Sequence, residues 1–120
     1  MNKQLFFSIA ILSLIFSSCE NDSESDLYSN SNNTELTYTT TIKAIITENC
    51  IMCHSQPPQN GAPMPLTTYS FLKDAVENRG LIDRISRPQG AEGMMPFGGT
   101  RLPQQKIDQI IAWKNNDYPE

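Results

Sequence analysis

Two cysteines and the single histidine of the chain lie within five consecutive residues, in the order Cys50-Ile51-Met52-Cys53-His54. Positions i, i+3 and i+4 share one face of a helical turn, so two thiols and an imidazole can converge on one flat object. This C-x-x-C-H spacing is the attachment signature of a c-type haem, whose vinyl groups take up the thiols as thioethers while the imidazole binds iron. We therefore interpret Cys50 and Cys53 as haem-binding residues and His54 as an axial iron ligand.

Three other uses of these residues are open. A structural zinc ion needs four ligands, usually Cys or His, and adjacent Cys53 and His54 would be awkward ligands of one tetrahedral ion. A thioredoxin-type redox pair requires a βαβ setting, which the sequence does not indicate. A plain disulfide between Cys50 and Cys53 is the simplest alternative in an oxidising compartment. Haem is favoured because the helical pattern and the signs of export agree with it.

The N-terminal residues have the pattern of an export signal. Lys3 is followed by an apolar run, 5–16, that is broken only by serines, and two further serines precede Cys19. The run is short for a membrane span, which needs about 20 apolar residues, although a retained anchor helix and an ordinary secretory signal are alternatives. The pattern resembles a bacterial lipoprotein signal. That resemblance implies a signal peptide at 1–18, lipidation of Cys19, and an exported protein anchored by lipid to a bacterial membrane, on its periplasmic side or at the cell surface.

Charge is distributed unevenly along the chain. Residues 19–35 hold five acidic residues and no basic one, and are rich in Ser and Asn. Such a segment buries too little apolar surface to fold, so we expect a disordered acidic tether. Residues 36–120 hold eight acidic and eight basic residues, without a Lys/Arg run. We therefore expect no nucleic-acid partner.

Apolar residues at helical spacing predict four short helices in residues 36–120. The first runs into Cys50 with isoleucines at i, i+3 and i+4. The last begins at Pro103, which suits a first helical turn because its missing N–H costs nothing there, and its isoleucine stripe is widened by Trp113. The isoleucines of these two helices are Ile42, Ile45, Ile46, Ile107, Ile110 and Ile111.

End signals place two helices between these. Thr67 or Thr68 can cap the second helix, and Gly80 ends it. The third must stop before Pro88, which disfavours helical geometry in the residue preceding it. Apart from threonines at 37–41, no alternating β-branched run appears, so the predicted fold class is all-α. A core this small supplies roughly 3–5 kcal/mol, so we expect haem to complete the interior.

The order of these features resembles the class I cytochrome c family. A helix ending in CIMCH is followed by intermediate helices, a Met-Pro pair in a glycine-rich loop and a C-terminal amphipathic helix, together covering 40–116. The resemblance implies a small helical domain, within residues 36–120, wrapped around one covalent haem. It also implies a methionine from the late loop, MMPFGG, as the second iron ligand. Met95, directly before the proline, is the implied ligand; Met94 is its nearest rival, and Met64 also precedes a proline.

Binding of iron by both His54 and Met95 would leave no position for a substrate, so the expected function is electron transfer by haem c, not enzymatic catalysis. The alternative is a haem enzyme or gas sensor with an open distal position, for which Arg101 or a tyrosine would have to serve. Redox proteins are the expected partners, and the membrane is reached through the N-terminal lipid. Candidates for pairing with the haem propionates, or plain surface charges, are Arg79, Arg84 and Arg87.

Overall fold

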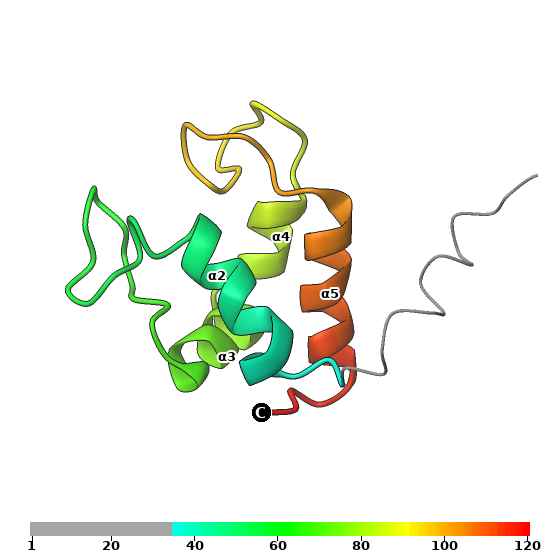
Figure 1. Ribbon diagram of the computed structural model, residues 1–120. Coiled ribbons are helices and arrows are strands. Elements are labelled where there is room, and N and C mark those ends of the chain that lie inside the picture. The colour runs from blue at the N-terminus through cyan, green and yellow to red at the C-terminus, as the bar shows by residue number, and fades with distance from the viewer. Residues whose placement is uncertain (1–34) are drawn as a thin grey trace, which may run out of the picture. The chain divides into compact units, whose positions relative to one another are not determined.

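The computed structural model describes residues 35–120, and within them the chain forms helices and loops without a strand (Figure 1). The predicted all-α fold is confirmed. The elements in order are the π-helical turn η2 (Tyr38–Ile42) and the helices α2 (Lys43–Asn49), α3 (Tyr69–Asn78), α4 (Leu81–Ser86) and α5 (Gln104–Asn115). The signal peptide at 1–18, Cys19 and all of the tether except Glu35 lie outside the described residues. Within the described part, no helix is long and apolar enough to cross a membrane.

The helix that leads into Cys50 starts earlier than its isoleucine stripe indicates, because η2 directly precedes α2. Thr37 Oγ1 accepts a hydrogen bond from the Thr40 N–H at 3.2 Å, and Thr40 Oγ1 accepts one from the Thr37 N–H at 3.1 Å. This reciprocal capping box satisfies two N–H groups at the helix start. The threonines at 37–41, which looked most like a strand, therefore begin a helix. The buried side chains of the stripe are Ile42, Ile45 and Ile46.

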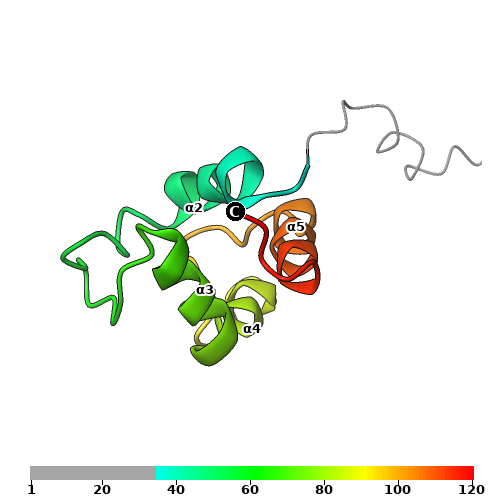
Figure 2. The ribbon, with the colours of Figure 1, turned by 90° about the horizontal axis from the view of Figure 1, so that it is seen from below.

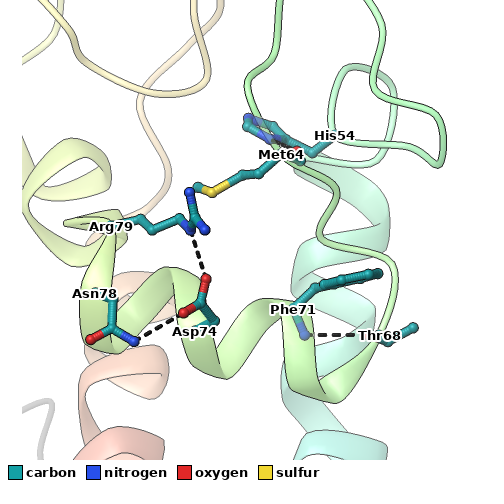
Figure 3. Close-up of polar contacts among 7 residues, drawn as sticks. All are labelled: His54, Met64, Thr68, Phe71, Asp74, Asn78 and Arg79. Carbon is teal, nitrogen blue, oxygen red and sulfur yellow. Dashed lines mark hydrogen bonds and ion pairs between the residues drawn. The ribbon is translucent and has the colours of Figure 1, made fainter.

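Helices α3 and α4 begin and end where the sequence signals predict. Thr68 caps α3, and its Oγ1 accepts a hydrogen bond from the Phe71 N–H at 3.2 Å (Figure 3). Gly80, with φ of +67°, turns the chain from α3 into α4. After α4, Arg87 has ψ of 148°, the extended geometry expected before Pro88.

Helix α5 packs against both α4 and η2. Pro103 stands at the N-cap, one position before the first turn. The buried face contains Ile107, Ile110 and Trp113, whereas Ile111 is only half-buried. Trp113, completely buried, therefore belongs to the centre of the apolar face and does not merely widen it.

The C-terminal segment is hydrogen-bonded to the start of the domain, and in Figure 1 it ends beside η2. The Pro119 carbonyl accepts hydrogen bonds from the Tyr38 N–H at 2.8 Å and from Trp113 Nε1 at 2.9 Å. The Tyr69 hydroxyl donates to the Tyr118 carbonyl at 2.8 Å. The rings of Tyr38, Tyr69, Trp113 and Tyr118 pack against one another with centroids 5.0–6.3 Å apart. Three of the four ring pairs meet edge to face. Aromatic contacts of this kind add to the stabilisation from burial alone.

Residues from all five helical segments contribute to one apolar core. Figure 2 shows α2, α3, α4 and α5 grouped around the middle of the described part. Its fully buried large side chains are Trp113, Ile42, Leu72, Ile107 and Ile110. A second set of apolar residues packs against this core but remains partly exposed: Leu36, Cys50, Ile51, Met64, Tyr69, Ile82, Met95 and Ile111. This set includes Cys50 of the C-x-x-C-H motif and two of the three candidate methionine ligands.

Candidate functional site

The helical turn that the C-x-x-C-H spacing requires is present. The Cys50 N–H donates to the Ile46 carbonyl at 2.9 Å, which joins the motif to α2. The Cys50 carbonyl in turn accepts hydrogen bonds from the N–H groups of Cys53, at 3.2 Å, and of His54, at 2.9 Å. Bonds from positions i+3 and i+4 to i hold the backbone in a helical turn. The motif thus directly follows α2, with Cys50 as the C-cap, and the two cysteines and the histidine lie in one hydrogen-bonded turn.

Both cysteines are free thiols and partly buried. The structure therefore does not use them in a disulfide, the simplest alternative that the sequence left open. Burial raises the pKa of the Cys50 thiol to about 11. In the folded chain this thiol is protonated near neutral pH, and a protonated thiol is a weak nucleophile.

His54 is oriented by a backbone carbonyl. Its Nδ1 lies 2.8 Å from the carbonyl oxygen of Met64, and its own carbonyl accepts a hydrogen bond from the Leu66 N–H at 2.8 Å. Because a carbonyl oxygen only accepts, the proton of this bond belongs to Nδ1. The neutral ring then has an unprotonated Nε2, the atom that binds a metal when Nδ1 is committed in this way.

Met64 is therefore part of the site, but through its backbone. The Met-Pro pair drew attention to this residue as a candidate iron ligand, whereas the structure uses its carbonyl oxygen to hold the imidazole. Figure 3 shows the Met64 side chain extending from the loop beside His54 toward Arg79. Every residue has a backbone carbonyl, so the identity of residue 64 does not reveal this contact, and the sequence pattern could not predict it.

The candidate distal methionines lie in the loop between α4 and α5, drawn in yellow to orange in Figure 1. Met94 is 5 % exposed, whereas Met95 is half-buried and packs against the apolar core. The Met95 N–H donates to the carbonyl of Arg84, in α4, at 3.1 Å. This loop and the loop that follows His54 both extend from the helical body, the former at the top and the latter at the left of Figure 1.

The three candidate propionate-binding arginines make other contacts. Arg79 pairs with Asp74 at 2.6 Å, and this contact lowers the pKa of the Asp74 carboxyl (Figure 3). Arg87 pairs with Asp83 at 2.6 Å. Arg84 donates to the Gly93 carbonyl at 3.3 Å. The Arg79–Asp74 pair is about half-exposed, whereas the Arg87 side chain is only 36 % exposed beside a more exposed Asp83.

The donor set fits a haem better than a metal ion bound by protein alone. Among residues 35–120 no three His, Cys, Asp or Glu side chains form a group that could hold a metal ion. An iron bound by His54 would therefore depend on a porphyrin for its other ligands. Two unbonded thiols on one turn, an imidazole with Nε2 available and half-buried apolar residues around them suit covalent attachment of such a ring.

Comparison with known families agrees with this geometry. The family described as cytochrome c oxidase, cbb3-type, subunit III matches residues 38–113, from η2 to Trp113 in α5. The chain belongs to this family. No curated protein and no solved structure matches it.

The match identifies the described part of the chain as a mono-haem c-type cytochrome domain, which binds haem c covalently together with its iron. The matched range contains both the C-x-x-C-H motif and the Met-Pro loop of this cytochrome domain. The predicted cofactor is thereby confirmed. The N-terminal residues up to 37 lie outside the match, so lipidation at Cys19 stays a prediction.

Proposed function

We propose that this cytochrome domain transfers single electrons, with its haem c bound by thioethers to Cys50 and Cys53 and its iron held by His54 and Met95. When bound, the haem supplies a one-electron iron couple. The observation that carries the proposal is the bond between His54 Nδ1 and the Met64 carbonyl, at 2.8 Å. It fixes the one tautomer of the only histidine that presents Nε2 for coordination.

The Met64 carbonyl has a further effect on the imidazole. Hydrogen bonding at Nδ1 fixes the orientation of the ring and raises the basicity of the coordinating nitrogen. The Leu66 N–H bond to the His54 carbonyl holds the backbone on the other side of the same residue. His54 is therefore preorganised by backbone groups, and its geometry needs little adjustment when the iron changes oxidation state.

Burial favours Met95 over Met94 as the distal ligand. Met94 is almost completely enclosed by protein, and a coordinating role would require it to leave that packing. Met95 is anchored at its backbone N–H to α4 but retains an accessible part of its side chain. A thioether ligand also suits an electron carrier, because it raises the reduction potential of the haem.

Two protein ligands on the iron leave no position for a substrate, so the proposed role is that of a carrier and not of an enzyme. Residues 36–120 are neutral before the cofactor is counted. We therefore expect redox partner proteins to dock with only weak electrostatic steering.

The N-terminal pattern supports a proposal about location. An export signal at 1–18, lipid on Cys19 and an acidic tether at 19–35 would anchor the domain to a bacterial membrane while leaving it free to reach partners. A single lipid chain binds a membrane only weakly, whereas multiple chains anchor stably. This part of the proposal rests on the sequence alone.

Absorption spectra of the holoprotein test the axial ligands. Wild type should be six-coordinate and low-spin in both oxidation states, with the long-wavelength charge-transfer band of methionine-bound ferric haem. Met95→Ala should lose this band, because the thioether is removed from the iron. Met94→Ala and Met64→Ala should retain it, and Met64→Ala also preserves the carbonyl that holds His54.

Two results would contradict the assignment. Survival of the charge-transfer band in Met95→Ala, with its loss in Met94→Ala, would move the ligand by one residue. A five-coordinate, high-spin wild type would instead favour the haem enzyme or gas sensor with an open distal position.

A further inference from the structure

The loop that carries the candidate distal ligand has little apolar packing of its own. Between Arg87 and Leu102, only Met94 is buried. A loop with so few buried apolar contacts is expected to open locally at low free-energy cost. The position of this loop therefore depends on polar contacts.

Arg87 bridges helix α4 and this loop. Its Nε and Nη2 donate to Asp83 Oδ2 at 3.1 and 2.6 Å, and its Nη1 donates to the Glu92 carbonyl. Asp83 lies one turn earlier in α4, so it fixes the guanidinium in place. One side chain thus connects the rigid helix to the backbone two residues before Met94.

Arg84 makes the second connection, immediately beside the candidate ligand. Its Nη1 donates to the Gly93 carbonyl at 3.3 Å, and its carbonyl accepts the Met95 N–H at 3.1 Å. Arg87 and Arg84 therefore bond to all three peptide groups between Glu92 and Met95.

Gly93 is required for this close approach. A Cβ at this position would lie 2.5 Å from Arg87 Nη1 and 3.0 Å from Arg84 Nη1. The first of these contacts is shorter than real Cβ atoms make, so any larger residue would displace the Arg87 guanidinium. Its φ of +70° is also a conformation that favours glycine.

The far end of the loop is held in a similar way. Arg101 Nε donates to the Arg87 carbonyl at 3.1 Å. Gln89 Oε1 accepts the Arg101 N–H at 2.7 Å, and Gln89 Nε2 donates to the Gly99 carbonyl at 3.1 Å. Both ends of the loop thus meet at the C-terminal end of α4.

From these contacts we propose that Arg87, fixed by Asp83, is a positioning residue for the distal methionine, an inference that rests on the proposed iron ligation by Met95. A neutral thioether is a soft, weak ligand for ferric iron, so its coordination depends on how firmly the protein presents the sulfur. By holding the loop on α4, Arg87 lowers the entropy that the loop loses when the sulfur binds. Removing the bridge weakens the methionine–iron bond without removing the methionine.

Competition by imidazole at the iron measures that bond in the holoprotein. Imidazole binds ferric haem only after displacing the methionine, so its dissociation constant reports the strength of the methionine–iron bond. We expect Arg87→Ala to bind imidazole roughly 5- to 10-fold more tightly than wild type, the scale of one or two partly exposed hydrogen bonds. Arg87→Lys should fall between the two, because an ammonium lacks the guanidinium fork that reaches both Asp83 and Glu92.

Lys106→Ala is the matched control. Lys106 pairs with Glu48 at 2.8 Å, with side chains 31 % and 63 % exposed against 36 % and 64 % for Arg87 and Asp83, and lies outside the loop. This variant should bind imidazole as wild type does, even if its thermal unfolding shifts equally. Asp83→Asn provides a second test should Arg87→Ala fail to mature, and should also tighten imidazole binding.

The outcomes separate the inference from the function on which it rests. A wild type that shows the methionine charge-transfer band, beside Arg87→Ala and Asp83→Asn variants that bind imidazole no more tightly, would overturn the positioning role alone. Absence of the band from wild type would overturn the proposed ligation itself.

Discussion

At the scale of single residues, the chemistry of this domain depends on backbone groups as much as on side chains. The motif supplies the imidazole of His54, but the Met64 carbonyl determines which of its nitrogens is available. The Met95 side chain is presented by a loop whose peptide groups bond to Arg84 and Arg87. The residues proposed as axial ligands, His54 and Met95, are thus organised by contacts that carry no residue-type signature.

A single glycine also decides whether two helices can follow one another directly. Gly80 has φ of +67° and would have no heavy atom within 4 Å of an added Cβ, so a substitution there is opposed by backbone conformation alone. We expect Gly80→Ala to destabilise the holoprotein by about 1–2 kcal/mol, which lowers the thermal midpoint of a domain this size by about 4–8 °C for each kcal/mol.

Asparagine provides the matched comparison at this position, because it tolerates the left-handed region better than alanine does. Thermal unfolding of the holoprotein, followed by far-ultraviolet circular dichroism, should therefore rank wild type above Gly80→Asn and Gly80→Asn above Gly80→Ala. An alanine variant as stable as wild type would show that this conformation carries no strain.

At the scale of elements, local signals predicted most of the helix boundaries. Thr68 caps α3, Gly80 ends it, and Pro88 limits α4, because each acts through its own backbone or that of its neighbours. The start of the first helix was missed, since the threonines at 37–41 suit a strand by propensity but form a capping box instead. Hydroxyl capping outweighed propensity there.

Long-range contacts between elements could not be predicted from local patterns. The C-terminal segment bonds to η2 through Tyr38 and Pro119, and Trp113 occupies the centre of the buried face of α5. The arginine contacts to the α4–α5 loop belong to the same class, because a charged residue in sequence is equally consistent with solvated surface. The cytochrome family and its haem c were predictable from the sequence, whereas the groups that position the candidate site residues were not. The iron ligation by His54 and Met95 stays a prediction.

At the scale of the whole molecule, the proposed lipid anchor is testable without the structure. Wild type expressed in a bacterium fed a radiolabelled fatty acid should incorporate the label and partition with membranes. Cys19→Ser should be unlabelled, because serine cannot form the lipid thioether, while still acquiring haem if export continues by another route. Equal labelling of wild type and Cys19→Ser would rule out Cys19 as the lipidation site.

We propose that the domain is built around one haem joined covalently to Cys50 and Cys53. The most direct test is the intact mass, after acidified-acetone extraction, of protein matured in a host that attaches haem. We predict that wild type is heavier than the double variant Cys50→Ser/Cys53→Ser by the mass of one haem, beyond the small sulfur-for-oxygen difference, because both proteins undergo the same N-terminal processing. A colourless wild type that folds compactly with both thiols unmodified would show that the domain is not built around a covalent haem.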